Sequence, residues 1–225
     1  MKNIFFLIVL NAVLPLNIYS QTNKLDIGVI GGVARITLRG NEIMDNNHRP
    51  AFGFIAGLSA QYNWKTVSLV TNVLLERKGS VIAMPLTDAN GNQIGSYNLT
   101  NALDYITLPL MIRKSFGNKI KFFANAGSYV AYLRAAEYRN SLVLIQSNKA
   151  FFKKEDVGLC FGIGLSFPLS NSMGFTAEIR NNLGLINISD VPVNNNVTIK
   201  TNSSALLLSF FYRFGRPYES TTDGY

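Results

Sequence analysis

The sequence predicts an all-β fold, an eight-stranded antiparallel up-and-down transmembrane β-barrel. Three observations predict it: apolar and polar residues alternate in many short runs, no helical period competes with them, and short and long connections alternate between the runs. Charged residues are only 15% of the 225 residues and the mean hydropathy is +0.15, which is apolar for a soluble domain. Apolar content spread over short alternating strands is typical of outer-membrane barrels.

The N-terminal segment has the features of a secretory signal peptide. Lys2 gives it a basic start, Ile4–Leu16 is its apolar region, and Ser20 is the expected last residue before cleavage. The apolar region is shorter than the ~20 residues that a spanning helix needs, so a membrane anchor is the less favoured alternative. The expected organisation is a signal peptide over 1–20, an outer-membrane β-barrel domain over 21–215 and a polar periplasmic tail over 216–225.

Eight alternating segments are the expected strands of the barrel. In chain order they are Leu25–Leu38, Ala51–Asn63, Thr66–Lys78, Ala102–Ser115, Ile120–Ala135, Asp156–Pro168, Met173–Leu185 and Ser203–Phe214. The four long polar connections are Arg39–Pro50, Gly79–Asn101, Ala136–Glu155 and Asn187–Asn202. The alternation puts the tight turns on one rim and the long loops on the other, as in barrels with short periplasmic turns. An even number of strands then places both ends of the barrel on the turn side.

The first four expected strands show which residues share a face. In the first strand, Gly28, Gly31 and Gly32 have no helix after them, which favours inward-facing or bulged positions over a nucleotide-binding loop. A tight turn around Trp64 joins the second strand to the third. The fourth strand carries an apolar face, opposite Arg113, that we expect to contact lipid; its residues are Ile106, Leu108, Leu110 and Ile112.

The last four expected strands continue this pattern after a tight turn at Gly117. The sixth strand contains V-G-L-C-F-G-I-G-L-S-F over Val157–Phe167, in which large apolar residues alternate with small ones. Its large side chains are also expected to face lipid, namely Leu159, Phe161, Ile163 and Leu165. In the seventh and eighth strands, apolar residues oppose Glu178, Arg180 and Arg213.

The charged residues opposite the apolar faces are expected inside the barrel. They are Glu76, Lys78, Arg113, Glu178, Arg180 and Arg213. The interior of an eight-stranded barrel is just wide enough to be filled by side chains, and buried charges must be paired. We therefore expect one internal network that joins Glu76 and Glu178 to the three arginines. The small face of the sixth strand leaves room for these charges, which favours a filled lumen over a wide pore.

The sequence offers little for catalysis, metals or cofactors. His48 is the only histidine and lies in the first long connection, with no nucleophile motif near it. Cys160 is the only cysteine, which excludes a disulfide framework and leaves histidine- or cysteine-based metal sites without ligands. Asp88, Asn90 and Asn92 match part of a calcium loop but lack its closing glutamate. We expect no catalytic residue, no metal and no cofactor.

Several motifs resemble those of the outer-membrane β-barrel domain family that is common in Bacteroidota, also labelled the porin family or PorT-like. They occur in the expected order and are "LDYITLPLMIR" from Leu103, "ANAGSYVAY" from Ala124, "DVGLCFGIG" from Asp156, "IRNNLGLINI" from Ile179 and a terminal "LSFFYRFG". The resemblance covers nearly all of Lys24–Gly215. It implies an integral outer-membrane location and identifies Tyr212 and Phe214 as part of a barrel-assembly signal, but it implies no single activity.

The expected role is structural or binding and non-enzymatic, with the long loops outside the cell. The alternatives are an accessory component of an outer-membrane secretion system, a small barrel enzyme or narrow pore, and a soluble ligand-binding barrel. The formal charge of +8 suits contact with anionic surfaces. The expected partners are therefore outer-membrane lipid and lipopolysaccharide, together with the barrel-assembly machinery and, in the alternative, secretion-system proteins. No nucleic-acid-binding motif is present, so no nucleic acid is expected.

Overall fold

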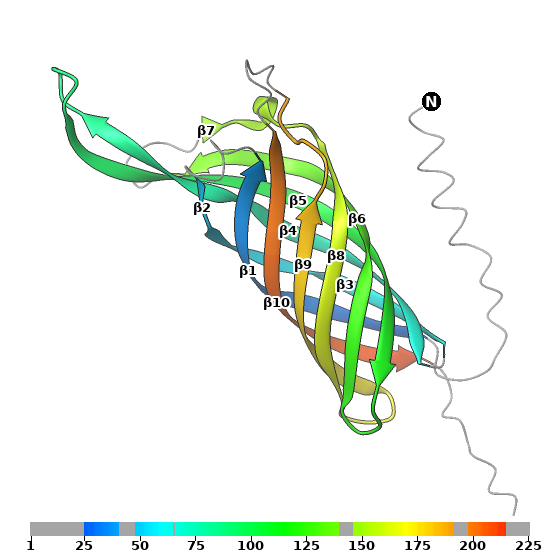
Figure 1. Cartoon of the computed structure of the whole chain (residues 1–225). Coiled ribbons are helices and arrows are strands. Elements are labelled where there is room, and N and C mark those ends of the chain that lie inside the picture. The colour runs from blue at the N-terminus through cyan, green and yellow to red at the C-terminus, as the bar shows by residue number, and fades with distance from the viewer. Residues whose placement is uncertain (1–24, 41–47, 65, 140–145, 191–197, 215–225) are drawn as a thin grey trace, which may run out of the picture.

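Eight long strands form the wall of a barrel (Figure 1). The structure, a computed structural model, describes residues 25–40, 48–64, 66–139, 146–190 and 198–214. The predicted signal peptide and C-terminal tail lie outside the described residues. The described elements are β1 (Leu25–Gly40), β2 (His48–Arg49), β3 (Ala51–Trp64), β4 (Val67–Thr87), β5 (Gln93–Phe116), β6 (Lys121–Arg139), β7 (Gln146–Ser147), the 3-10 turn η1 (Lys149–Phe151), β8 (Glu155–Pro168), β9 (Met173–Gly184) and β10 (Ile199–Phe214).

The sheet closes on itself. The long strands follow the order β4-β3-β1-β10-β9-β8-β6-β5, and β4 also pairs with β5. Each of these pairs is antiparallel, and the first and last strands pair along their whole length, from Leu25 with Phe214 to Gly40 with Ile199. This ring confirms the prediction of an all-β, eight-stranded up-and-down barrel. The short strand β2 pairs with β4 at Val81 and Ile82, and β7 pairs with the end of β6.

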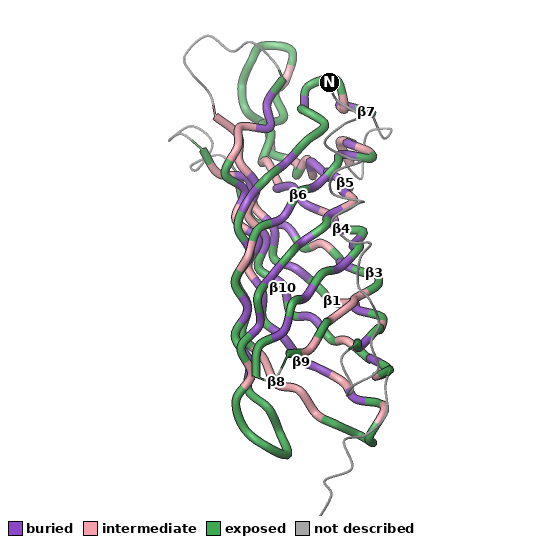
Figure 2. Tube along the Cα trace, turned by 90° about the vertical axis from the view of Figure 1, so that its right-hand side faces the viewer, coloured by how far each residue is buried: buried purple, intermediate pink, exposed green. Residues whose placement is uncertain are grey.

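Burial alternates residue by residue along the wall (Figure 2). In β8, for example, Val157, Leu159 and Phe161 are exposed while Gly158 and Cys160 between them are buried. Successive strand residues point to opposite faces, so one set lines the lumen and the other forms the outer wall. The core therefore lies inside the barrel, where Leu74 and Leu133 are fully buried.

The tight connections lie at one end of the barrel, which we call the turn end; the opposite end is the loop end. They join β3 to β4, β5 to β6 and β8 to β9, and Leu25 and Phe214 lie side by side at the same end. Gly117 in the β5–β6 turn has a φ of +96°, and a Cβ there would lie 2.7 Å from the carbonyl oxygen of Ile120. The turn therefore requires glycine at this position.

The expected loop Gly79–Asn101 is wrong, because most of it forms a long hairpin. β4 continues to Thr87 and pairs with β5 from Gln93 onward, and in Figure 1 this hairpin projects beyond the rim. Gly79 interrupts the alternation but not the strand: its φ is +139°, and a Cβ there would overlap the carbonyl oxygen of Asn101 at 1.8 Å. Glycine at this position therefore allows the two strands to approach closely.

The other long connections are shorter than expected. Strand β1 extends to Gly40, β6 to Arg139, and β10 begins at Ile199. In the connection that follows β7, Phe152 is 6% exposed and packs in the core at the loop end. Among the described residues, no helix is long and apolar enough to cross a membrane.

Candidate functional site

The charged side chains of the lumen form three groups along the barrel axis. We call them the turn-end pair, the central group and the loop-end group. Each member stands at an inward-facing position of its strand, since the residue before it in sequence lies on the outer wall.

The turn-end pair consists of Asp26 and Arg213. The two residues are direct partners across the β1–β10 seam. Arg213 Nε donates to Asp26 Oδ1 at 2.8 Å, and Nη2 donates to Oδ2 at 3.0 Å. This bidentate geometry is the strongest that an arginine and a carboxylate form. The pair therefore links the first strand to the last at the end where the ring closes.

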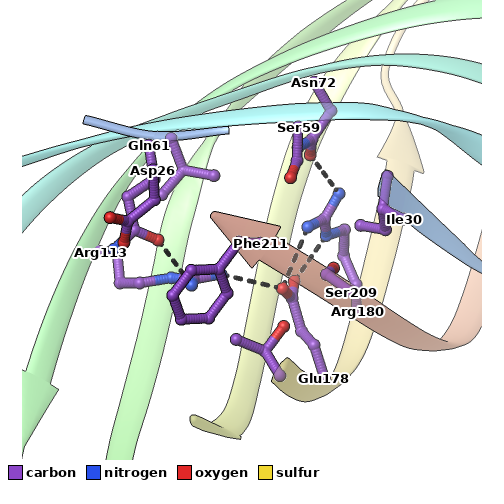
Figure 3. A pocket seen from close by; sticks show the side chains of 12 residues that line it. Asp26, Ile30, Ser59, Gln61, Asn72, Arg113, Glu178, Arg180, Ser209 and Phe211 are labelled. Atoms are coloured by element: carbon purple, nitrogen blue, oxygen red, sulfur yellow. Dashed lines mark hydrogen bonds and ion pairs between the residues drawn. The ribbon is translucent and has the colours of Figure 1, made fainter. Parts of the chain in front are cut away.

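The central group is built around Glu178 on β9 (Figure 3). Arg180 donates from Nε to Glu178 Oε1 at 2.6 Å and from Nη2 to Oε2 at 3.0 Å, while Arg113 Nη2 reaches Oε2 at 3.1 Å. Each remaining guanidinium nitrogen also donates, to Asn72 Oδ1 from Arg180 and to Gln61 and Asn125 from Arg113. One carboxylate thus holds two buried guanidinium groups, which come from β5 and β9.

Glycines on β8 provide the room for this group. A Cβ at Gly162 would lie 2.6 Å from Glu178 Oε1, and a Cβ at Gly164 would lie 2.5 Å from the ring of Phe123. The Phe123 ring in turn lies under Arg113, with 3.7 Å between the guanidinium carbon and the ring centroid. The small face of β8 is therefore occupied by the long side chains of its neighbours.

The loop-end group is built around Lys78 on β4, which is 1% exposed. Its Nζ lies 2.8 Å from Asp156 Oδ2 and 3.9 Å from Glu76 Oε2. Two tyrosine rings flank the ammonium, Tyr129 at 4.2 Å and Tyr105 at 5.2 Å. Asp156 Oδ2 also accepts from Tyr129 and Thr201, and Glu76 accepts from Thr107 and Asn182. This network ties together strands from around the ring.

The expected single network is wrong in its pairing. Glu178 does bind Arg113 and Arg180, but Glu76 pairs with Lys78 and not with an arginine, and Arg213 binds Asp26. Asp26 and Asp156 were missing from the prediction. Each is separated by an even number of residues from inward-facing positions of its own strand. The strand pattern therefore indicated that both point into the lumen. Their partners depend on register across the ring.

The lumen is closely packed around these groups. Together they contain four acidic and four basic side chains, so their formal charges cancel. The space between the turn-end pair and the central group measures about 20 Å³, which is room for about one water molecule. The described side chains thus leave no wide passage at this level.

The residues expected to face lipid lie on the outer wall. Leu108, Leu110 and Ile112 are 41–62% exposed, Leu159, Phe161 and Ile163 are 37–64% exposed, and Ile106 and Leu165 are partly exposed. Tyr212 and Phe214 also lie on the outer wall, with their rings in edge contact at 4.9 Å. That these surfaces contact lipid or an assembly factor stays a prediction.

His48, the only histidine, belongs to β2 and pairs with Ile82 of β4 at the backbone level. Within the described ranges, no group of three or more His, Cys, Asp and Glu side chains could hold a metal ion. Asp88 stands at the tip of the β4–β5 hairpin, where it accepts hydrogen bonds from the backbone of Asn92 and Asn90. These bonds, the one from Asn92 first, hold the pKa of the Asp88 carboxyl below its usual range. Asp88 therefore orders the turn.

Comparisons with known proteins agree with this architecture. Residues 19–190 match the sequence model of a family described as outer membrane protein beta-barrel domain. A major outer membrane protein from Thermus thermophilus is similar in structure, with 13% identity, a TM-score of 0.52, and coverage of 84% of this chain and 99% of that chain. Neisserial surface protein A is also similar, with 13% identity, a TM-score of 0.48, and coverage of 84% and 97%. No curated protein matches the sequence of this chain.

Proposed function

Because the chain belongs to the outer membrane protein β-barrel domain family, we propose that it is a non-enzymatic barrel with a sealed lumen that displays the β4–β5 hairpin at the cell surface as a binding element. The family and the similar structures indicate an outer-membrane location. Neither the family nor the similar structures indicate the sealed lumen, the direction of display or the binding role.

The length of β4 and β5 is the observation that carries this proposal. The two strands have 21 and 24 residues, whereas a tilted transmembrane strand needs about 9–11. The excess forms a two-stranded ribbon beyond the rim (Figure 1). Met84, Leu86 and Ile94 are 37–63% exposed on this ribbon. Apolar side chains on a projecting element are typical of interaction sites.

The packing of the lumen argues against a pore or an enzyme as the main role. The central group and the loop-end group occupy the interior at two successive levels with fully buried side chains, among them Arg180 and Lys78. A substrate or solute would have to displace paired charges, which is costly in a low-dielectric interior. The lumen groups are therefore best explained as the rigid core of a barrel that anchors the β4–β5 hairpin in the membrane.

The direction of display follows from the connections. In outer-membrane barrels the short turns face the periplasm and the longer connections face outward. The three tight connections of this chain lie together at the turn end, so the hairpin at the loop end faces outward. Exposed basic residues of the loop end, among them Arg35, Arg49 and Lys153, would then meet lipopolysaccharide phosphates. The barrel-assembly machinery would be a partner during biogenesis only.

The secretion-accessory alternative depended on the tail 216–225, which lies outside the described residues. No described contact favours this alternative over the display of the hairpin. Membership of a Bacteroidota or PorT-like subgroup is likewise a prediction from sequence motifs.

Single-cysteine labelling on intact cells tests the direction of display. Cys160 is the only native cysteine and is fully buried, so an introduced cysteine reports alone. A membrane-impermeant maleimide should label Ile94→Cys on intact cells, because Ile94 is 63% exposed on the hairpin. The control is Asn171→Cys in the β8–β9 turn, which should react only after the outer membrane is permeabilised. Labelling in the opposite order would reverse the proposed orientation.

Shortening the hairpin tests whether the barrel needs it in order to fold. A chain in which residues 84–97 are replaced by a two-residue turn should still form the barrel, since the wall strands keep their pairing below the rim. Heat-modifiable gel mobility measures this. Loss of the folded band would show that the hairpin stabilises the barrel, which would contradict the proposal that it is a binding element.

A further inference from the structure

The outer wall has an apolar recess near the turn end, over β6, β8 and β9. It encloses about 560 Å³ and is lined almost only by apolar atoms. Its floor is made by the small residues Ala124, Gly164 and Ala177. The side chains that rise around the floor are large, and they include Phe116, Phe122, Ile163, Ile179 and Leu206.

The strand register explains why the wall is hollow at this place. Ala124 is paired with Ile163, and Leu165 with both Phe122 and Ala177. Two outward-facing alanines therefore stand among neighbours that are much larger. Gly164 faces inward, and the ring of Phe123 closes the wall behind it. The recess is thus open on the outer wall but closed at its floor, and it does not lead into the lumen.

One basic side chain, Lys114 on β5, lies next to two residues that line the recess, Ala124 and Phe116. Lys114 is the direct partner of Ala124 on the same outer face. Its Nζ donates to Thr66 Oγ1 in the β3–β4 turn at 2.8 Å and lies 6.0 Å from the ring centroid of Phe116, which lines the recess. A long lysine side chain on a lipid-facing wall places its ammonium at the membrane surface in this way. Lys119 and Lys121 are exposed in the adjacent turn, whose residues 116–121 include no acid.

We propose that this recess binds an acyl chain of an anionic glycerophospholipid, whose headgroup phosphate is held by Lys114. The recess supplies an apolar slot of defined shape, and the lysine supplies a positive charge at the depth of the headgroups. An acyl chain alone would not select among lipids. The lysine beside the slot selects an anionic headgroup over a zwitterionic one, by about fivefold for one lysine near the membrane surface.

Native mass spectrometry of the full-length barrel tests the headgroup preference. The protein in detergent is incubated with equal amounts of phosphatidylglycerol and phosphatidylethanolamine that carry the same acyl chains. The wild type should retain phosphatidylglycerol about fivefold more often, and Lys114→Gln should bring the ratio close to one. Lys200→Gln, which removes a lysine on β10 at the loop end, is the matched control and should keep the preference. Equal retention by the wild type would overturn the proposal.

Filling the recess tests where the lipid binds. Ala177→Phe should remove the retained lipid, because its ring would occupy the floor of the slot. Ala56→Phe makes the same change on the outer wall of β3, away from the recess, and should retain the lipid. Heat-modifiable mobility establishes that both variants fold, and Ala124→Phe replaces Ala177→Phe if the latter does not fold. Retention of lipid by a folded, filled variant would contradict binding in this recess.

Discussion

Glu178 is the residue on which the central group depends. Its carboxylate is 2.6 Å from Arg180 Nε and 3.1 Å from Arg113 Nη2, and the side chain is 2% exposed. Two guanidinium groups in a buried space repel each other unless a negative charge lies between them. Removing one member of a buried ion pair leaves an uncompensated charge, which costs far more than removing a surface pair.

We expect Glu178→Gln to lower the free energy of unfolding by about 3–5 kcal/mol. Urea unfolding in lipid vesicles measures this through the fluorescence of Trp64, the only tryptophan. Glu137→Gln is the control, because Glu137 and Arg139 form a pair at 2.9 Å with side chains 31% and 41% exposed. It should cost about 1 kcal/mol or less. Equal costs for the two variants would show that Glu178 is not the centre of the lumen packing.

The strand pattern predicted which charges lie inside, but not which ones meet. Alternation alone placed Glu76, Lys78 and Arg113 opposite the apolar faces. Their contacts join strands far apart in the sequence, such as Lys78 on β4 with Asp156 on β8. Such contacts depend on the stagger of every pair of strands around the ring, which local alternation does not encode. The expected contact of Glu178 with Arg113 is present, but alternation did not distinguish it from the expected pairing of Glu76 with an arginine, which is wrong.

Strand β8 shows how one element serves two environments. Its outward face carries Leu159, Phe161 and Ile163, and its inward face carries Gly158, Cys160 and Gly162. The outward residues are bulky because they are exposed on the outer wall, where no inward-facing side chain restricts their size. The inward residues are small because Glu178 and Tyr129 already occupy the space next to them. The alternation of size therefore records the neighbours on each side.

Two adjacent substitutions in β8 separate these environments. Phe161→Arg should cost about 2–4 kcal/mol, because Phe161 is 47% exposed on the outer wall and a charge at mid-depth must be taken into lipid. Cys160→Ser should cost about 1 kcal/mol, since serine is close to cysteine in size and the partner of this position on β9, Asn182, is polar. Urea midpoints in vesicles measure both. Equal tolerance of the two changes would mean that the assigned faces are wrong.

The strands in the membrane were easier to predict than the hairpin outside it. Alternation is strong along the barrel wall, and at the turn end each of the eight expected strands begins or ends within one residue of the observed strand. Beyond the rim both faces of β4 and β5 meet water, so alternation fades, and Gly79, Pro85 and Asp88 are typical of loops. The ribbon is maintained by its turn, where Asp88 accepts from Asn92 and Gly91 has a φ of +84°.

At the scale of the whole molecule, the side chains of the three charged groups fill the lumen along the barrel axis. The lumen charges cancel, and the space near the central group holds about one water molecule. We therefore expect no steady ion conductance when the full chain is reconstituted into planar bilayers. A porin of about 16 strands, which encloses an aqueous channel, is the positive control. Open-channel steps that depend on the presence of this protein would contradict a sealed lumen.

The pairing of β1 with β10 has a consequence for how the protein is made. Asp26 and Arg213, which meet at this seam, are 187 residues apart in the sequence. Because synthesis starts at the N-terminus, the sheet cannot close into a barrel until the last strand, β10, has been made. Until then the growing sheet has two unpaired edges, which invite pairing with other chains. These edges need protection during biogenesis. Pairing of β10 with β1 removes them, and without it the exposed edges favour aggregation.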